Sequence, residues 1–571
     1  MIANRTGLHG QGCFDRCTPA SRQNMSDRGS ARRRPAPPPL CSARMTQLAT
    51  LELLLFLLAG AVMLALLARR LGVPSACVFV LGGMGLAITP GVPKLDLAPE
   101  LTMALFLPPL LLASAYFTVW RDFRDNLRPI LLLAVGAVAF TTAAVGWVLK
   151  LLVPDLPWAA CFTLGAIVSP PDAVSAAAVL EKLRIPRRLL VILEGESLVN
   201  DASGLVLYRF GVVAALTGAF STVQAVGTFV LVGAGGIAVG YACGRGAIWV
   251  LRRLDDTYLE IAASFLAAWG SYLVAERIGV SGVLSTVTCG LVMGLWQHET
   301  VSSRTRMESN ATWSFIVFVL EAMVFILIGL SLNGVLTRIS GWRLLIQFLP
   351  LAAIISATVI VTRFIWVFPA TYLPRLLIPA IRRADPYPPW QQPAVIGWAG
   401  MRGVVSLAAA LALPEGFPGR DLILLTTFGV ILATVLIQGT TLGPLIVALG
   451  VETDKGDDGP PPEAKARLEV DRAMLQLMED RATDPLDGAI AQDLVREYRD
   501  RAGWSERVHG GGGAVRAERT ARLALRLEAL GAGRQKLLEL HGAEKIHDEV
   551  LRQIEQDLDL EEVRLRRMLP D

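Results

Sequence analysis

Ionisable side chains inside long apolar segments are the first candidates for chemistry in this sequence. Asp172 lies in TLGAIVSPPDAVSAAAVL, Glu196 and Asp201 lie in VILEGESLVNDASGLVLYRF, and Arg402 lies in AVIGWAGMRGVVSLAAALALP. On insertion scales, a charge at the centre of a bilayer costs about 3 kcal/mol, so such groups mark ion paths or ion pairs by default. The other main ionisable groups of this kind are Glu194, Glu321 and Arg363.

Asp172 follows a predicted break in a helix. Pro170 and Pro171 remove two backbone donors and disfavour helix at the preceding residues, which should free carbonyl groups such as those of Val168 and Ser169. The break leaves a partly negative and a partly positive helix end inside the segment, and a carboxylate would stabilise the positive one. The alternative interpretation is that Asp172 is only a buried cap.

The next segment places four polar groups within six residues. Glu196 and Asn200 share one helix face by i, i+4 spacing, and Ser197 and Asp201 share the adjacent face. Carboxylate, hydroxyl and free carbonyl oxygens are hard ligands that suit a weakly held alkali cation. We therefore predict that this polar stretch forms a site for an alkali cation. The alternative is polar contact between helices, which fits Glu194 better than Asp201.

Arg402 lies between Gly400 and Gly403, in the middle of a second interrupted segment. A guanidinium there must be paired or must face freed carbonyl groups. We predict a structural ion pair with Glu196. The alternative partners of Arg402 are Asp172 and Glu321. Arg363 and Glu321 could pair with each other or line the pathway, and we interpret both as structural.

The composition defines the elements that must position these residues. The chain has 571 residues, 53% hydrophobic and 18% charged, with a mean hydropathy of +0.49. Charged residues make up about 12% of residues 47–449 but about 39% of residues 450–571, and only the first value suits a lipid-embedded segment. A soluble globule, a disordered chain, a fibrous repeat and a disulfide scaffold are excluded, and a net charge of +4 gives no indication of nucleic-acid binding.

We predict an all-α membrane protein with a soluble tail. Its domains are a disordered or mispredicted extension at 1–46, with Met45 as the suspected true start, a transmembrane domain at 47–450 and a cytoplasmic helical region at 451–571. Thirteen spans are expected, at about 47–68, 74–91, 98–118, 129–153, 157–179, 188–217, 222–251, 257–276, 279–297, 311–336, 342–370, 391–413 and 421–449. If the first span begins outside, the inner loops carry 17 Lys or Arg and the outer loops 6. Because cytoplasmic loops are enriched in Lys and Arg, this excess supports that orientation and a cytoplasmic C-terminus.

The two segments interrupted by Gly or Pro, 157–179 and 391–413, are the fifth and twelfth spans. We predict that the first six spans form one repeat, that the seventh connects, and that the last six form an inverted copy. Each interrupted span is then the fifth span of its repeat. Broken helices at matching positions are typical of a transporter binding site. The alternative is that Gly and Pro are simply common in membrane helices.

Three motifs in this order carry a resemblance to a known family: SPPDAVSA at 169–176, EGESLVNDASGLV at 194–206 and GMRGVVSLA at 400–408. FLPPLLL at 106–112 adds to it. The sequence resembles the bacterial members of the cation:proton antiporter-1 family, which exchange Na⁺ or K⁺ for protons. The resemblance covers about 47–450.

The resemblance implies a thirteen-helix homodimer of two inverted six-helix repeats in the cell membrane, serving pH and cation homeostasis. Asp201 matches the family's transport aspartate, preceded by Asn200 as in the electroneutral branch. Asp172 and Ser197 match its cation ligands, and Glu196 and Arg402 match the pair that orders its core. Two positions depart from the pattern, because Pro171 stands where many relatives have Thr and Ala113 where some have Glu.

The expected function is exchange of Na⁺, or K⁺ or Li⁺, for H⁺ by competition at Asp201. Burial disfavours the charged form of this carboxyl group, so a proton and a cation should replace each other there. No cofactor is expected, and the partners are the transported ions, the lipid bilayer and a second copy. The alternatives are an intramembrane aspartyl protease using Asp172 and Asp201, and a cation channel.

Overall fold

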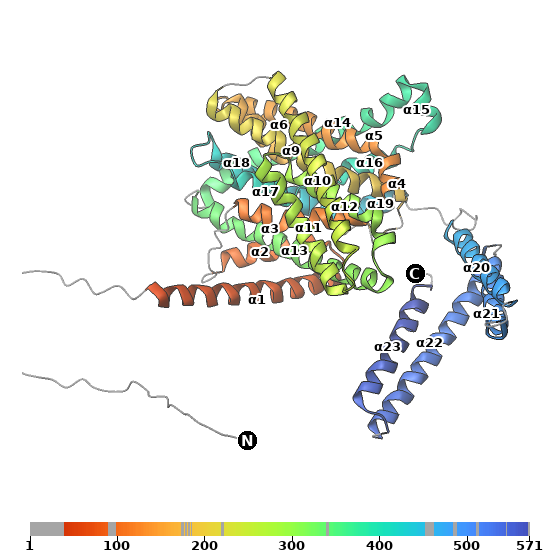
Figure 1. The fold of residues 1–571 in the computed structure, drawn as a ribbon. Coiled ribbons are helices and arrows are strands. Elements are labelled where there is room, and N and C mark those ends of the chain that lie inside the picture. Colours follow the sequence, from red (N-terminus) through yellow and green to blue (C-terminus); the bar gives the residue numbers. More distant parts are fainter. Residues whose placement is uncertain are drawn as a thin grey trace, which may run out of the picture. The chain divides into compact units, whose positions relative to one another are not determined.

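The computed structural model is all helical over the residues it describes (Figure 1). The chain divides into two compact units, Met1–Glu452 and Thr453–Asp571. The described residues are 39–89, 99–172, 176, 180, 183, 185–218, 222–338, 342–451, 462–483, 488–509, 513–543 and 545–568. The predicted extension before residue 39 and the predicted linker at 454–462, except for Pro462, lie outside them.

The first unit is built of helices that are long, apolar or both. Seven helical segments in the described part of this unit are long and apolar enough to cross a membrane, and four shorter apolar helices accompany them. The elements are α1 (Pro39–Leu71), α2 (Ser75–Ile88), α3 (Pro99–Phe117), α4 (Trp120–Asp125), α5 (Leu127–Leu131), the π-helix η1 (Leu132–Ala137), α6 (Val138–Leu152), α7 (Trp158–Val168), α9 (Arg187–Thr217), α10 (Thr222–Leu251), α11 (Thr257–Ile278), α12 (Gly282–Thr300), α13 (Ser303–Arg338), α14 (Trp342–Leu377), α15 (Pro379–Ala384), α16 (Gln391–Trp398), α17 (Val404–Leu411), α18 (Arg420–Ala433), the π-helix η2 (Thr434–Gln438) and α19 (Gly439–Leu449).

The outward-facing side chains of this unit fit a lipid environment. Large apolar residues such as Leu231, Leu266 and Phe315 are well exposed in the middle of long helices. A soluble monomer rarely exposes contiguous apolar surface on this scale, whereas lipid tails cover it without cost. Together with the apolar helices, this surface identifies a multi-pass membrane protein.

Both predicted interrupted segments are broken in the structure. Helix α7 ends at Val168, directly before Ser169 and the two prolines, and residues 399–403 separate α16 from α17. The predicted division between 257–276 and 279–297 is also confirmed, because Gly279 adopts a left-handed conformation with φ of 84° and ends α11. The count of thirteen spans and the inverted repeats stay predictions.

Small residues let the helices approach closely around the broken segment. The Gly165 backbone in α7 lies against the carbonyl group of Thr142 in α6, and Gly204 in α9 lies against the ring of Pro170. Close approach through small residues is the usual way in which helices pack in a membrane. This packing holds the end of α7 against the polar stretch of α9, which carries the predicted site residues.

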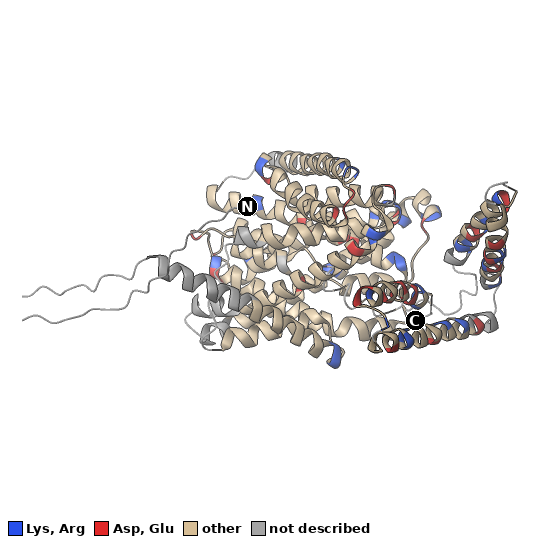
Figure 2. Cartoon of the chain, turned by 60° about the horizontal axis from the view of Figure 1, so that its bottom comes forward, with Lys and Arg blue, Asp and Glu red and all other residues tan. Residues whose placement is uncertain are grey.

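The second unit is a set of amphipathic helices rich in charge (Figure 2). The prediction of helices around 515–568 is confirmed, and two further helices precede them. Ion pairs join the helices in pairs, with Arg472 and Glu506 2.7 Å apart between the first two and Arg534 and Glu562 2.8 Å apart between the last two. The helices are α20 (Pro462–Arg481), α21 (Gly488–His509), α22 (Gly513–Gly542) and α23 (Asp548–Arg566).

Candidate functional site

The two helix breaks lie against each other near the polar stretch of α9. The backbone N–H of Asp172 donates a hydrogen bond to the carbonyl oxygen of Met401, with 2.6 Å between the two atoms. Each break leaves backbone groups that no helix uses, and here one break partly satisfies the other. The sequence-predicted breaks at Pro170–Pro171 and Gly400–Gly403 are therefore brought together.

Arg402 occupies this crossing and donates to the freed carbonyl groups. Its Nε lies 2.8 Å from the Val168 oxygen and one Nη lies 3.2 Å from the Ser169 oxygen, while the other Nη donates to Gly400. The side chain is almost wholly buried, with 1% of the residue exposed. The expectation that the break frees the Val168 and Ser169 carbonyl groups is confirmed, and a guanidinium with five N–H donors is well suited to them.

The predicted ion pair between Glu196 and Arg402 is wrong, because Glu196 pairs with Arg363 of α14. The two Nη atoms of Arg363 lie 2.6 and 2.8 Å from the two carboxylate oxygens, and both side chains are 2% exposed. Arg363 reaches Glu196 along α16, where its Nε donates to the Ile396 carbonyl group at 3.1 Å. Gly400 leaves room for this path, since a Cβ at that position would overlap the Arg363 side chain.

The position of each arginine explains which acceptors it meets. Arg402 lies inside a break and is surrounded by carbonyl groups, whereas Arg363 enters from a continuous helix and meets a carboxylate that can accept both arms of its fork. The sequence contained a signal for this role, because Arg363 is an arginine within an apolar segment. The sequence alone predicts a structural role for Arg363 but does not identify Glu196 as its partner.

Asn200 anchors α9 to the first break. Its Nδ2 donates to the Pro171 carbonyl oxygen at 2.6 Å, and the residue is fully buried. The amide oxygen of Asn200 has no hydrogen-bond partner among the residues that the structure describes. A buried amide fixed at one end thus presents an oxygen acceptor beside the carboxylate of the next residue, Asp201.

Asp201 and Asp172 form the acidic part of the site. Asp201 is buried, and the residue before it, Asn200, donates to the carbonyl group of Pro171, the residue before Asp172. The Asp172 carboxylate lies directly against Gly403, where any Cβ would overlap it. The second break therefore needs glycine at 403 to let α17 begin beside this carboxylate.

These groups can hold one small cation or one proton. The available ligands are carboxylate and amide oxygens, and Ser197, half-buried one turn before Asp201, adds a hydroxyl on the same helix face. A buried carboxylate favours the uptake of a positive charge, because burial disfavours its charged form. Among the described residues, no group of three or more His, Cys, Asp or Glu side chains could hold a tightly bound metal ion.

A second charged cluster, which sequence reasoning missed, lies at the ends of several helices. Asp385, between α15 and α16, accepts both arms of the Arg188 guanidinium at 2.8 and 2.9 Å. Arg128 of α5 and Arg375 of α14 each reach the same carboxylate at 2.6 Å. In the sequence, these three arginines only add to the excess of Lys and Arg in the predicted inner loops, and nothing distinguishes Asp385 from other acidic residues outside the apolar segments.

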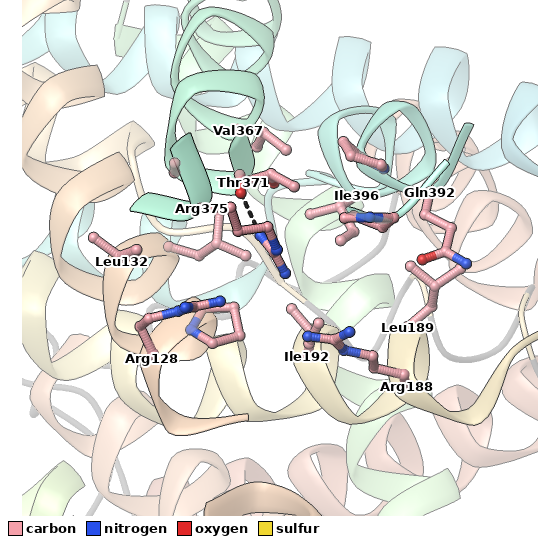
Figure 3. A pocket seen from close by; sticks show the side chains of 15 residues that line it. Arg128, Leu132, Arg188, Leu189, Ile192, Val367, Thr371, Arg375, Gln392 and Ile396 are labelled. Carbon is pink, nitrogen blue, oxygen red and sulfur yellow. Dashed lines mark hydrogen bonds between the residues drawn. The ribbon is translucent and has the colours of Figure 1, made fainter. Parts of the chain in front are cut away.

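The electrostatics of this second cluster keep Asp385 ionised. Partial burial would raise the pKa of Asp385, but hydrogen bonds from Arg188 and Arg375 and the charges of these two side chains outweigh it and lower the pKa from 3.8 to about 2. One carboxylate therefore serves three guanidinium groups at neutral pH. The three arginines line an inner cavity, shown in Figure 3, and Arg128 and Arg188 also line a larger cavity that adjoins it.

A multi-pass helical body in which two broken helices meet beside buried carboxyl groups defines an ion-coupled membrane transporter. Comparison with known proteins identifies the family of this transporter. Residues 54–448 match the family described as sodium/hydrogen exchanger, transmembrane. The chain belongs to this sodium/hydrogen exchanger family.

Relatives in the family are similar over most of the chain. An uncharacterised Na⁺/H⁺ exchanger of Mycobacterium tuberculosis is 33% identical over 530 residues, which are 90% of this chain and 96% of the relative. A sodium, potassium, lithium and rubidium/H⁺ antiporter of Bacillus pumilus is 32% identical over 489 residues, covering 81% of this chain and 70% of the relative. The Na⁺/H⁺ antiporter ApNhaP of Aphanothece halophytica is 33% identical over 385 residues, which cover 67% of this chain and 71% of the relative.

A solved structure supports the fold. The sodium proton antiporter MjNhaP1 from Methanocaldococcus jannaschii at pH 8 aligns with a TM-score of 0.53, covering 71% of this chain and 99% of that chain. The two sequences are 18% identical in this alignment, so the likeness concerns the arrangement of helices alone.

Proposed function

We propose that the protein exchanges Na⁺ for H⁺ across the membrane by competition at Asp201. The observation that carries this proposal is the position of Asp201, which is buried beside Asp172 where Asn200 joins α9 to the first helix break. Family membership and the names of the relatives support the reaction. Because the Bacillus pumilus relative is named for four alkali cations, K⁺ and Li⁺ are the next candidate substrates.

The chemistry of the exchange follows from the cost of burying charge. An empty Asp201 carboxylate is disfavoured inside the protein, and either a proton or an alkali cation neutralises it. A cation that enters from one side therefore displaces the proton, and a proton that enters from the other side displaces the cation. If only the neutralised site can cross between the two faces, one cation moves for one proton and no net charge is transported.

The remaining side chains would support Asp201. Asp172, Ser197 and the free amide oxygen of Asn200 supply oxygen ligands to the cation. Arg402 holds the carbonyl groups of the first break, and the pair of Glu196 with Arg363 fixes α9 to α14. We assign these last residues a positioning role.

Several finer features belong to the same proposal. We place the protein in the plasma membrane as a homodimer that serves pH and cation homeostasis, with the unit from Thr453 in the cytoplasm. The excess of Lys and Arg in the predicted inner loops supports this orientation. The family likeness supports the remaining features.

Proteoliposomes containing the full chain and a pH-sensitive dye inside test the reaction. A gradient of Na⁺, K⁺ or Li⁺ should drive proton movement with the wild-type protein. Asp201→Asn should abolish this movement, because an amide side chain does not take up and release a proton near neutral pH. Asp155→Asn is the matched control, since Asp155 is an exposed carboxylate in the loop before α7. Exchange retained by Asp201→Asn would refute competition at this residue.

The same vesicles separate exchange from the two alternatives. An electroneutral exchanger keeps its rate when K⁺ and valinomycin impose a membrane potential, whereas a channel gives single-channel currents in a planar bilayer. Cleavage of membrane peptides that is lost in Asp172→Asn and Asp201→Asn would indicate a protease. Neither the family nor the fold favours a channel or a protease.

A further inference from the structure

The cluster around Asp385 carries more positive charge than its own fold requires. Arg128, Arg188 and Arg375 donate to this one carboxylate from three different helices. Arg188 alone already engages both oxygens of Asp385 in a bidentate pair, which is the strong form of this contact. The other two guanidinium groups add positive charge, and among the described residues no second carboxylate lies within ion-pair distance of them.

The acidic neighbours do not balance this excess. Asp122 of α4 pairs with Arg187, with 2.8 Å between their charged groups, and Asp125 is one further acid at the edge of the larger cavity. The segments 120–130, 187–192 and 375–388 together contain eight arginines and three aspartates, which gives them a net charge of +5. An anion placed here would meet a favourable field.

The arginines face a space that can receive such an anion. The larger cavity has a volume of about 690 Å³ and lies among α4, α9 and α15. The inner cavity, of about 40 Å³, continues from it between α5, α9, α14 and α16, and Arg128 and Arg188 line both. Figure 3 shows the guanidinium groups of Arg128, Arg188 and Arg375 directed toward one region, with apolar side chains around them.

The surroundings of the cluster are those of a membrane surface. Leu376, Leu377 and Ile378, at the end of α14, are exposed beside it, and so are the aromatic side chains of Tyr387 and Trp390. Exposed apolar residues followed by aromatic ones are typical of the level where lipid tails give way to headgroups. Basic pockets between helices at this level are suited to the phosphate groups of anionic lipids.

We infer that Arg128 and Arg188, supported by Arg375, bind the phosphate group of an anionic membrane lipid in the cavity beside Asp385. Each guanidinium group has more N–H donors than its contacts with Asp385 use, and the remaining N–H groups of Arg128 and Arg188 can donate to phosphate oxygens while Asp385 holds the side chains in place. A free phosphate ester has the same chemistry, so the test distinguishes the two sources. The inference does not depend on which ion the protein transports.

The position of the lipid gives it a role in the fold. Arg188 lies on α9, eight residues before Glu196, and Arg375 lies on α14, twelve residues after Arg363. The lipid phosphate would therefore bridge the same two helices that the buried pair joins deeper in the protein. Binding should stabilise the native state, because a ligand that binds only the folded protein raises its stability.

The test uses the purified full chain in detergent, depleted of native lipid. Native mass spectrometry counts retained lipid, and thermal unfolding reports stabilisation, with phosphatidylglycerol compared with phosphatidylcholine. The wild type should retain phosphatidylglycerol and gain stability from it, and phosphatidylcholine should do neither. Arg128→Gln with Arg188→Gln should weaken the retention about tenfold, since two of the three forks are lost.

Two further variants keep the result interpretable. Arg252→Gln with Arg253→Gln removes the same charge at the end of α10 and should bind lipid like the wild type. Arg128→Lys with Arg188→Lys keeps the charge without the fork and should recover only part of the binding. Size-exclusion chromatography confirms folding, and Asp385 still has Arg375 as a partner in every variant.

The outcomes are distinct. Equal lipid retention by the wild type and the Arg128→Gln, Arg188→Gln variant would overturn the site, and so would an equal loss in the α10 control. Stabilisation by inorganic phosphate or ATP, lost in the same variant and without retained lipid, would support the phosphate site and overturn its assignment to lipid.

Discussion

Two ionic centres join α9 to α14, and they differ in how deeply they are buried and in their net charge. The deeper one is a single pair, Glu196 with Arg363, in which both side chains are 2% exposed. The outer one gathers Arg188 of α9 and Arg375 of α14 on Asp385, which is 20% exposed. The pair at the deeper centre is neutral and buried, whereas the outer centre is positive and borders a cavity.

The difference indicates separate tasks for the two centres. A buried charge that loses its partner is strongly unfavourable, so the deeper pair fixes one arrangement of α14 against α9, the helix that carries Asp201. A partly exposed cluster with surplus charge can change its partners at little cost. It is therefore suited to contacts with groups outside the protein.

Breaking the deeper centre should produce the largest effect. Glu196→Gln leaves the Arg363 guanidinium buried without a counter-charge and should destabilise the protein by about 3–5 kcal/mol. Unfolding in detergent monitored by intrinsic fluorescence measures this loss, with Glu415→Gln, an exposed loop residue, as the control.

A double replacement sharpens the interpretation of this first result. Glu196→Leu with Arg363→Met removes both charges together and should recover much of the lost stability, as apolar replacement of a buried ion pair often does. If the double variant were as unstable as Glu196→Gln, the shape of the side chains and not their charge would fix α9 to α14.

Sequence reasoning succeeded where local chemistry decides the structure. Proline removes backbone donors wherever it stands in a helix, so the break at Pro170–Pro171 and the free carbonyl groups of Val168 and Ser169 could be predicted. The donor to those groups, Arg402, was also singled out from its type and its glycine neighbours. These features depend on residues within one segment.

It failed where the partner lies far along the chain. Arg363 and Arg402 are both arginines in apolar segments, and spacing alone does not tell which one reaches Glu196, because that depends on how α14 crosses α16. Asp385 was missed for a different reason. It lies outside the apolar segments, where an acidic residue is common and attracts no attention until the structure shows three arginines around it.

Acid should weaken the outer centre over a defined pH range. The pKa of Asp385 is about 2 in the folded protein against an ordinary 3.8, so its contribution is present above pH 3.8 and is lost as the pH falls toward 2. The shift corresponds to about 2 kcal/mol. Asp385→Asn should therefore be less stable than the wild type at pH 7, and the gap should close between pH 4 and pH 2.

Thermal unfolding of both proteins across this pH series measures the gap, with Asp155→Asn as an exposed control. A gap that stayed constant down to pH 2 would mean that the Asp385 side chain stabilises the protein by its shape and hydrogen bonds, and not by its charge.

A third ion pair, more exposed than either centre, should show the smallest effect. Arg209 of α9 lies 2.9 Å from Glu276 of α11, with the side chains 52% and 32% exposed. Exposed pairs contribute about 0–1 kcal/mol because water and salt screen them. A double-mutant cycle with Arg209→Gln and Glu276→Gln isolates this coupling from the hydrogen bond that Glu276 also accepts from the Gly282 N–H. Coupling below about 1 kcal/mol that fades with added NaCl would show that water reaches this part of α9. A larger coupling that salt leaves unchanged would place the pair against lipid. The rule that a more exposed ion pair stabilises the protein less would then hold only for the two centres on α14.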